Sequence, residues 1–325
     1  MNSISRRSFL AGSAGAAALA LTACGGSGSG SSDASGDKTY KIGVLQLTQH
    51  AALDAANEGF VEALDASGIK YTIDQQNANN DQSACATIAS KLVGDGDDLI
   101  FAIATPAAQA VAAATTDIPI VGSAITDYAA SGLVADNDKP GGNLTGTSDM
   151  NPVDDQIAML QKVLPEAKHI GMLYCTAESN SQLQIEMAEA ACDKAGLTTE
   201  RFTVSSSNEI QSVVESMVGK VDAGYSPTDN TIAAAAAQVG QIAKEGKLPF
   251  ITGEENMCMG MGICTVSIDY KELGKMAGEM AVKILKGEDT PANMAIETET
   301  GDQLQTIKNE EMAEALGIDL SVLDA

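Results

Sequence analysis

Residues 41–75 read KIGVLQLTQHAALDAANEGFVEALDASGIKYTIDQ. The stretch begins with β-favouring residues, continues with Leu53, Ala56 and Phe60 at helical spacing, and becomes β-favouring again after Gly68. Glycine is the usual residue just past the end of a helix. The pattern therefore predicts a strand at 41–47, a helix at 53–67 and a strand at 70–75, which is the repeating unit of parallel α/β folds.

The same alternation continues along the chain in two blocks, which predicts an α/β fold with two Rossmann-like lobes rather than one wide sheet. In the first block we expect strands at 98–104 and 118–123 and helices at 82–94 and 107–115. In the second block we expect helices at 153–164, 181–195, 208–218 and 231–245, and strands at 169–174, 199–204, 223–226 and 249–252. A strand at 263–268, a helix at 270–286 and an extended run at 295–300 complete the chain.

Two blocks of this kind require the chain to cross between lobes, through a hinge of several strands. The glycine-rich run Gly141–Thr147 is the expected first crossing, because glycine tolerates the backbone turns of a hinge. The late strand, helix and extended run supply two more crossings. We therefore expect lobe 1 to comprise residues 38–147 with about 270–292, and lobe 2 to comprise 148–269 with about 293–325.

The N-terminus has the pattern of an export signal. Arg6 and Arg7 precede an apolar run, and the small residues that follow end at Cys24. This order predicts a lipoprotein signal peptide of the twin-arginine type at residues 1–23, with Cys24 lipidated and residues 24–37 forming a flexible Gly/Ser-rich tether. We expect an exported protein, anchored by lipid alone to the outer face of the cytoplasmic membrane, at the cell surface or in the periplasm.

Charge and cysteine content exclude several functions. The net charge is −25, and removal of the leader leaves 17 basic against 44 acidic residues, or −27, which opposes nucleic-acid binding. No zinc-type spacing, phosphate loop or nucleophile motif is present, so neither a metal nor a cofactor is expected. The remaining cysteines are odd in number and are compatible with disulfides or with buried free thiols: Cys85, Cys175, Cys192, Cys258 and Cys264.

Ligands of open parallel sheets bind beyond the carboxyl ends of the strands, so the residues that follow each expected strand are the candidate binding residues. In the first block these are Gln49, His50, Thr105, Pro106, Ala107, Ser123 and Asp127. In the second block they are Glu178, Asn180, Ser181, Asp229, Asn230, Glu254 and Met257.

Two groups of these residues suit the two ends of an α-amino acid. Thr105 and Pro106 stand at a helix start, where threonine caps, proline fits the first turn, and free N–H groups hold an anion. Glu178, Asp127 and Asp229 bring negative charge suited to an ammonium group. The alternatives are a plain helix cap for Thr105 and solvated or capping roles for the carboxylates.

Met257 belongs to a methionine run that suits either an adaptable apolar pocket or the core. The absence of Trp makes a sugar ligand less attractive, because sugar sites commonly stack rings on aromatic faces.

Several segments of the sequence resemble those of a known family. They are IGVLQLTQHAALDAANEGF (42–60), DLIFAIATPAAQA (98–110), IPIVGSAITDYAASGLV (118–134), NLTGTSD (143–149), LPEAKHIGMLYCTAESNS (164–181), SPTDNT (226–231) and IDYKELGKMAGEMAVKILKGE (268–288). The chain resembles the ABC transporter substrate-binding lipoproteins of the tryptophan/tyrosine type, which have the type I periplasmic-binding fold. The resemblance implies an aromatic or hydrophobic amino acid captured between the lobes and delivered to a membrane permease and its ATPase.

The sequence thus favours a monomeric binding protein that does no chemistry on its small-molecule ligand. Two alternatives stay open. One is a ligand-sensing ectodomain partnered with a signalling receptor, and the other is a small-molecule enzyme using His50 with Asp54 or Glu178.

Overall fold

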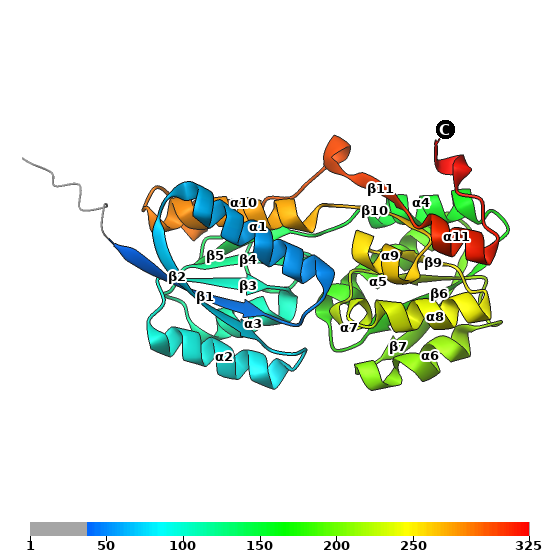
Figure 1. Cartoon of the computed structure of the whole chain (residues 1–325), viewed down its shortest axis with the longest axis horizontal. Helices are drawn as coiled ribbons and strands as arrows, with labels where there is room; N and C mark the ends of the chain where they lie inside the picture. The colour runs from blue at the N-terminus through cyan, green and yellow to red at the C-terminus, as the bar shows by residue number, and fades with distance from the viewer. Residues whose placement is uncertain (1–37, 325) are drawn as a thin grey trace, which may run out of the picture. The chain divides into compact units, whose positions relative to one another are not determined.

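The computed structural model describes residues 38–324. Their first sheet consists of five parallel strands in the order β2-β1-β3-β4-β5 (Figure 1). These strands are β1 (Thr39–Gln46), β2 (Lys70–Asn77), β3 (Leu99–Ile103), β4 (Ile120–Ile125) and β5 (Leu144–Ser148). The helices packed on this sheet are α1 (Ala51–Ser67), α2 (Gln82–Asp95), α3 (Thr105–Ala114) and α10 (Tyr270–Leu285).

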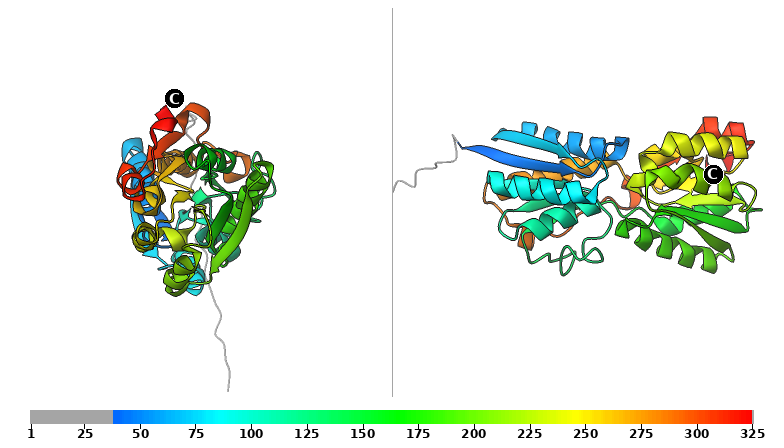
Figure 2. Two further views of the ribbon diagram at one scale, coloured as in Figure 1. Left: turned by 90° about the vertical axis from the view of Figure 1, so that its right-hand side faces the viewer. Right: turned by 90° about the horizontal axis from the view of Figure 1, so that it is seen from below.

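The second sheet has six strands in the order β11-β10-β9-β8-β6-β7, and only the edge strand β11 runs antiparallel to its neighbour. The strands are β6 (His169–Cys175), β7 (Thr198–Val204), β8 (Ala223–Ser226), β9 (Phe250–Thr252), β10 (Cys264–Ser267) and β11 (Gln305–Lys308). Its helices are α4 (Val153–Val163), α5 (Ser179–Lys194), α6 (Ile210–Met217), α7 (Asn230–Ala233), α8 (Ala236–Gly246), α9 (Glu255–Met261) and α11 (Glu310–Leu316). In both lobes helices cover the two faces of the sheet (Figure 2), which confirms the predicted pair of Rossmann-like lobes.

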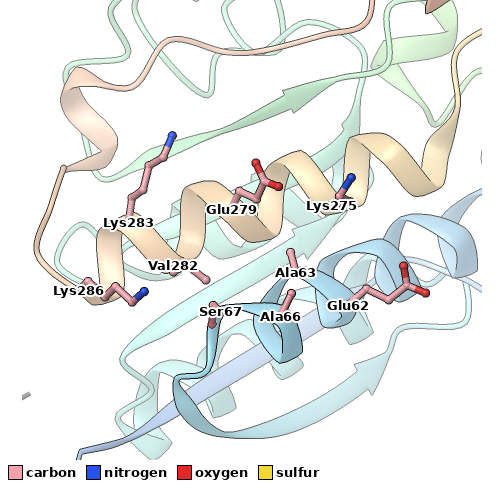
Figure 3. A pocket seen from close by; sticks show the side chains of 9 residues that line it. All are labelled: Glu62, Ala63, Ala66, Ser67, Lys275, Glu279, Val282, Lys283 and Lys286. Atoms are coloured by element: carbon pink, nitrogen blue, oxygen red, sulfur yellow. The ribbon is translucent and has the colours of Figure 1, made fainter. Parts of the chain in front are cut away.

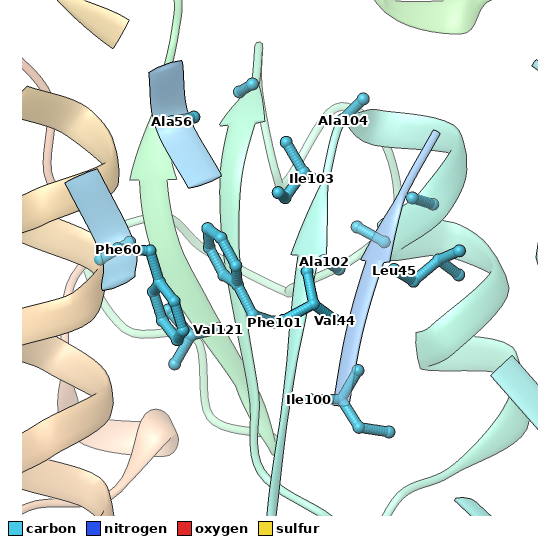
Figure 4. Packing of buried hydrophobic residues seen from close by; sticks show 14 of the residues in the cluster. Val44, Leu45, Ala56, Phe60, Ile100, Phe101, Ala102, Ile103, Ala104 and Val121 are labelled. Carbon is cyan, nitrogen blue, oxygen red and sulfur yellow. The ribbon is translucent and has the colours of Figure 1, made fainter. Parts of the chain in front are cut away.

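The core of the first lobe follows from the periodicity of α1. Leu53, Ala56 and Phe60 are buried, and the Phe60 ring stacks on Phe101 of β3 with ring centroids 3.8 Å apart (Figure 4). The helix ends at Gly68, whose φ of 71° is a left-handed conformation that glycine adopts without strain. The apolar face of α1 thus fixes the loop before the helix against the carboxyl end of β1.

The run Gly141–Thr147 is not the crossing between lobes. Leu144 and Thr145 are buried and pair in register with Ile120 and Val121, so this segment forms the edge strand β5 of the first sheet. The chain leaves the lobe after Ser148, because only there does the β pairing end.

Three segments connect the lobes. Asp149 follows β5 and leads toward α4, Ile268 and Asp269 join β10 to α10, and the stretch 298–304 leads to β11. Hydrogen bonds join these segments: the Asp269 N–H donates to Glu299 Oε2 at 2.6 Å, and the Ile268 N–H donates to Asn151 Oδ1 at 3.1 Å. The connection is therefore a hinge of three segments joined by hydrogen bonds rather than a single flexible linker.

Candidate ligand-binding site

The start of α3 differs from the expected cap. The residue before the helix is Ala104, with φ of 85°, and Thr105 is the first helical residue. The hydroxyl of Thr105 therefore does not cap the helix; its Oγ1 is buried and has no hydrogen-bond partner among residues 38–324. The Ala104 N–H donates to Ser123 O at 3.0 Å, which fixes the strained turn against β4. The first-turn N–H groups of α3 keep the anion-binding character expected of a helix start.

Glu178 already accepts several hydrogen bonds from the start of α7. Its carboxylate accepts from the backbone N–H and side-chain Nδ2 of Asn230, at 3.1 and 2.6 Å, and from the N–H and hydroxyl of Thr231, at 2.9 and 2.7 Å. The side chain is 2% exposed. Both oxygens are therefore occupied by protein donors in this arrangement.

Asp229 has a similar structural role. It caps α7 by accepting from the Ile232 N–H at 2.9 Å, and its other oxygen accepts from the Cys175 N–H at 2.6 Å. Burial, followed by the nearby charge of Glu178, raises the pKa of Asp229. The two carboxylates together tie the end of β6 to the beginning of α7.

Glu254 caps a helix that the sequence analysis did not predict. Its carboxylate accepts from the N–H groups of Asn256 and Met257, both at 2.6 Å, at the start of α9. Burial raises its pKa to about 7. Met257 is fully buried in the core of the second lobe, whereas Met259 is 54% exposed, so the methionine run is split between interior and surface.

The other expected residues have varied positions. Ser123 and Ser181 are buried, and Asn180 donates to Thr228 O at 3.1 Å. Asp127 is half-buried and accepts from Ala130 N and Asn137 Nδ2, so it holds its own loop. Gln49 is exposed. Cys24 lies outside the described residues.

The two lobes touch through side chains that follow their strands. His50 Nε2 and Asn230 Oδ1 are 3.1 Å apart, and Asn80 Nδ2 donates to Thr231 Oγ1 at 2.9 Å. Gln82 Nε2 reaches Ala177 O at 3.0 Å. The expected site residues of the two lobes are thus brought face to face.

A small cavity of about 10 Å³ lies beside the His50–Asn230 contact, and both residues line it. It has room for about one water molecule. Its wall comes from both lobes and from the hinge: His50, Ala52, Leu53, Asp149, Thr228, Asp229, Asn230, Ala233, Glu254, Met257 and Tyr270. Two of its buried polar atoms, His50 Nδ1 and Asp149 Oδ1, have no hydrogen-bond partner among residues 38–324. Unpaired buried polar atoms are costly, so a ligand or a buried water that supplied the missing partners would stabilise this arrangement.

A second, more open cleft of about 380 Å³ is also lined from both lobes. Asn80 and Pro106 line it from the first lobe, and Cys175, Glu178 and Thr231 line it from the second. The start of α3 therefore faces the cleft through Pro106.

Asp149 and Tyr270 are the two cavity residues in the hinge that the sequence analysis missed. Tyr270 donates its hydroxyl proton to Asp149 Oδ2 at 2.8 Å, and burial raises the pKa of Asp149 to about 6. Asp149 follows β5 directly, so the rule that ligand residues follow strands would have found it if the glycine-rich run had been interpreted as a strand.

Other features of the described chain lie apart from this site. A surface groove of about 530 Å³ runs between α1 and α10, where Figure 3 shows Glu62 and Glu279 near three lysines. The five cysteines within residues 38–324 are buried and free. In the same range no helix has the length and apolar content needed to cross a membrane, and no cluster of His, Cys, Asp or Glu is arranged to hold a metal.

Two facing lobes with a cavity lined from both define a ligand-binding clamp. Residues 41–322 match the sequence profile of a family described as ABC transporter substrate binding protein. A tyrosine-binding protein of Clostridioides difficile (strain R20291) is 40% identical over 283 residues, which cover 86% of this chain and 81% of that protein. The chain belongs to the ABC transporter substrate binding protein family and has its type I periplasmic-binding fold.

Two solved structures of similar identity differ in how well they superpose on this chain. The ABC domain of Streptococcus pneumonia in complex with L-Trp is 41% identical, covers 88% of this chain and 98% of its own, and gives a TM-score of 0.84. The ligand-free, open structure of a substrate binding protein with adhesive properties from Clostridium difficile is 42% identical. The match covers 86% of this chain and 95% of that chain, with a TM-score of 0.66. Although the identities are nearly equal, this chain superposes better on the L-Trp complex than on the ligand-free, open structure.

Proposed function

We propose that this protein is the extracytoplasmic binding component of an ABC importer for an amino acid, with an aromatic or hydrophobic side chain favoured. The observation that carries this proposal is the interlobe cavity, whose wall joins both lobes and includes the unpartnered atoms His50 Nδ1 and Asp149 Oδ1. The names of the relatives support the ligand class, since one is a tyrosine-binding protein and another was solved with L-Trp.

Ligand entry requires the lobes to separate. A cavity of about 10 Å³ has no space for an amino acid, so the His50–Asn230 contact must break to admit one. We infer that the lobes, with the residue ranges expected from the sequence, rotate about the hinge and close again on the ligand. The first turn of α3 near Thr105 and Ala107 would then hold the ligand carboxylate.

The same proposal includes delivery of the unchanged ligand to a membrane permease and its ATPase, without catalysis by this chain. The N-terminal sequence supports a lipid anchor at Cys24, with the binding protein acting as a monomer outside the cytoplasmic membrane. Cys24→Ser should release the protein from the membrane fraction with its ligand affinity intact. Full membrane retention of that variant would contradict the anchor.

Isothermal titration with L-Tyr, L-Trp, L-Phe and L-Leu tests the ligand class. At least one should bind, and its deaminated and decarboxylated analogues should bind much more weakly, because a buried unpaired charge is costly in a closed cleft. A thermal-shift screen extends the test to the other amino acids, since a ligand at 100 times its Kd stabilises by about 2.7 kcal/mol. Failure of every amino acid to bind would overturn the proposal.

A further inference from the structure

Asp149 differs from the other acidic residues on the wall of the small cavity. Both carboxylate oxygens of Asp229 accept backbone N–H groups, one at the start of α7 and one at the end of β6, and both oxygens of Glu254 accept N–H groups at the start of α9. Asp149 uses Oδ2 to accept from Tyr270, whereas Oδ1 has no hydrogen-bond partner of good geometry among residues 38–324; the Thr126 side chain lies near enough to the carboxylate to lower its pKa. Asp149 is 4% exposed, so bulk water scarcely reaches that oxygen, and only a group inside the small cavity, a single water molecule or part of a ligand, can pair with it. It is the acidic group of this wall that still has an oxygen to offer a ligand.

The surroundings of Asp149 favour a positively charged partner. The described wall of the cavity contains three carboxyl side chains and neither Lys nor Arg. Burial lowers the pKa of His50, which keeps its ring neutral at neutral pH. An ammonium group supplies both the donor that Oδ1 lacks and the charge that the wall lacks.

We propose that Asp149 Oδ1 is the subsite for the ammonium group of the amino-acid ligand, and that Tyr270 positions the carboxylate for this contact. The inference rests on the proposed function and adds the residue that recognises the amine. It replaces the expectation that Glu178 and Asp229 hold the amine, because protein donors already occupy the oxygens of those two carboxylates.

The position of this pair connects ligand recognition to the hinge. Asp149 lies on the first connecting segment and Tyr270 at the end of the second. Asn151 joins them further, since its Nδ2 donates to Asp149 O and its Oδ1 accepts from the Ile268 N–H. Points near a rotation axis move least when lobes rotate, so we expect the contacts of Asp149 with Tyr270 and Asn151 to persist when the lobes open.

The test pairs one residue change with one ligand change. Titrations use L-Tyr and L-Trp, each with its deaminated analogue, 3-(4-hydroxyphenyl)propionic acid and indole-3-propionic acid. The wild-type protein should prefer the amino acid about 30-fold or more, as expected for a buried charge pair. Asp149→Asn should bind the amino acid about as weakly as the deaminated analogue. A matched control is Glu299→Gln, which changes a buried hinge carboxylate that does not line the cavity and should keep the preference.

Tyr270→Phe provides a second variant that retains the carboxylate. Loss of the hydroxyl donor should weaken the amino acid about 3- to 10-fold, while the deaminated analogue binds as before. A purely structural role of Tyr270 would weaken both ligands equally. This variant keeps the proposal testable if Asp149→Asn fails to fold.

Proton release gives a measurement on the wild-type protein. Burial raises the pKa of Asp149 to about 6, and a bound ammonium lowers it, so binding near pH 6 should release a proton and affinity should fall below that pH. Glu254, Asp229, His50, Tyr128 and Tyr270 also face this region, so the release must shrink in Asp149→Asn to be assigned to Asp149.

The outcomes separate this inference from the proposed function. Amino-acid binding that survives Asp149→Asn with its preference for the amine intact overturns the subsite alone. If no amino acid binds the wild-type protein, the proposed function fails first, and the subsite fails with it.

Discussion

At the scale of single residues, Glu178 shows how a side chain that looks like a ligand group can instead hold the site together. It is buried at the start of α5, yet its carboxylate accepts four hydrogen bonds of 3.1 Å or less from Asn230 and Thr231 of α7. Two of those donors are backbone N–H groups that the short helix α7 leaves unpaired at its start. The carboxylate therefore stabilises the loop that presents Asn230 to His50.

We expect Glu178→Ala to unfold more easily, by about 3 kcal/mol or more, because buried N–H donors would lose a charged acceptor. Urea denaturation followed by circular dichroism measures the change. Glu186→Ala, an exposed carboxylate two turns further along α5, is the matched control and should leave the midpoint unchanged. A Glu178→Ala protein of normal stability that has lost only ligand affinity would instead support a direct ligand contact.

At the scale of elements, the packing of α1 against α10 depends on glycines that face each other across the two helices. A Cβ added to Gly59 of α1 would overlap the Lys271 carbonyl oxygen of α10, and one added to Gly274 would overlap the carbonyl oxygen of Ala56. The helices approach so closely that backbone occupies the space of a side chain. This contact fixes α10, and with it Tyr270 at the end of the hinge, on the first lobe.

Gly59→Ala and Gly274→Ala should each destabilise the protein by about 1–3 kcal/mol, the usual range for overpacking, because backbone atoms must shift to admit the methyl group. Gly94→Ala in α2 is the control: its Cβ would meet open space, and alanine is the better helix former, so stability should stay equal or rise by up to about 1 kcal/mol. Thermal unfolding of the three variants, compared with the wild-type protein, measures these changes in stability. Equal destabilisation by all three would refute the close-packing argument.

Local periodicity predicted most elements because their signals are local. The helix α1 has a regular apolar face and a terminal glycine, and the structure begins it two residues earlier than expected. Strand β5 was missed because the glycine-rich run 141–147 resembles a hinge, whereas pairing with β4 defines the strand. The predicted helix 231–245 is divided into α7 and α8, and 295–300 forms no strand beyond one bridge at Glu297. Elements defined by long-range pairing carry little local signal.

The residues of the candidate site likewise divide into those that a local rule predicts and those that depend on distant neighbours. The rule that ligand residues follow the carboxyl ends of strands identified five residues that line the small cavity: His50, Asp229, Asn230, Glu254 and Met257. The same rule cannot tell a carboxylate that caps a helix from one with a free oxygen, because that depends on neighbours from other elements. Asp149 was missed because the run before it was not recognised as strand β5, whereas the capping roles of Glu178, Asp229 and Glu254 depend on donors from other elements.

At the scale of the whole binding unit, the contacts between the lobes decide whether the protein stays closed without a ligand. The chain superposes better on the L-Trp complex than on the ligand-free, open relative. The contacts that join the lobes outside the hinge include polar pairs such as His50 with Asn230, Asn80 with Thr231 and Gln184 with Thr126. Polar contacts of this kind contribute about 0.5–1.5 kcal/mol each, so a few of them do not hold the lobes shut against the freedom gained on opening.

We expect the ligand-free protein to populate open states and an amino-acid ligand to shift it to the closed one, because the ligand adds contacts to both lobes only when they are closed. Small-angle X-ray scattering of the Cys24→Ser protein should show a smaller radius of gyration with ligand. His50→Ala removes a lobe-to-lobe contact and should increase the radius of the free protein, whereas His169→Ala, at the start of β6 and away from the cavity, should not. Identical scattering with and without a ligand that binds by calorimetry would contradict the clamp, since a cavity of about 10 Å³ admits an amino acid only if the lobes move.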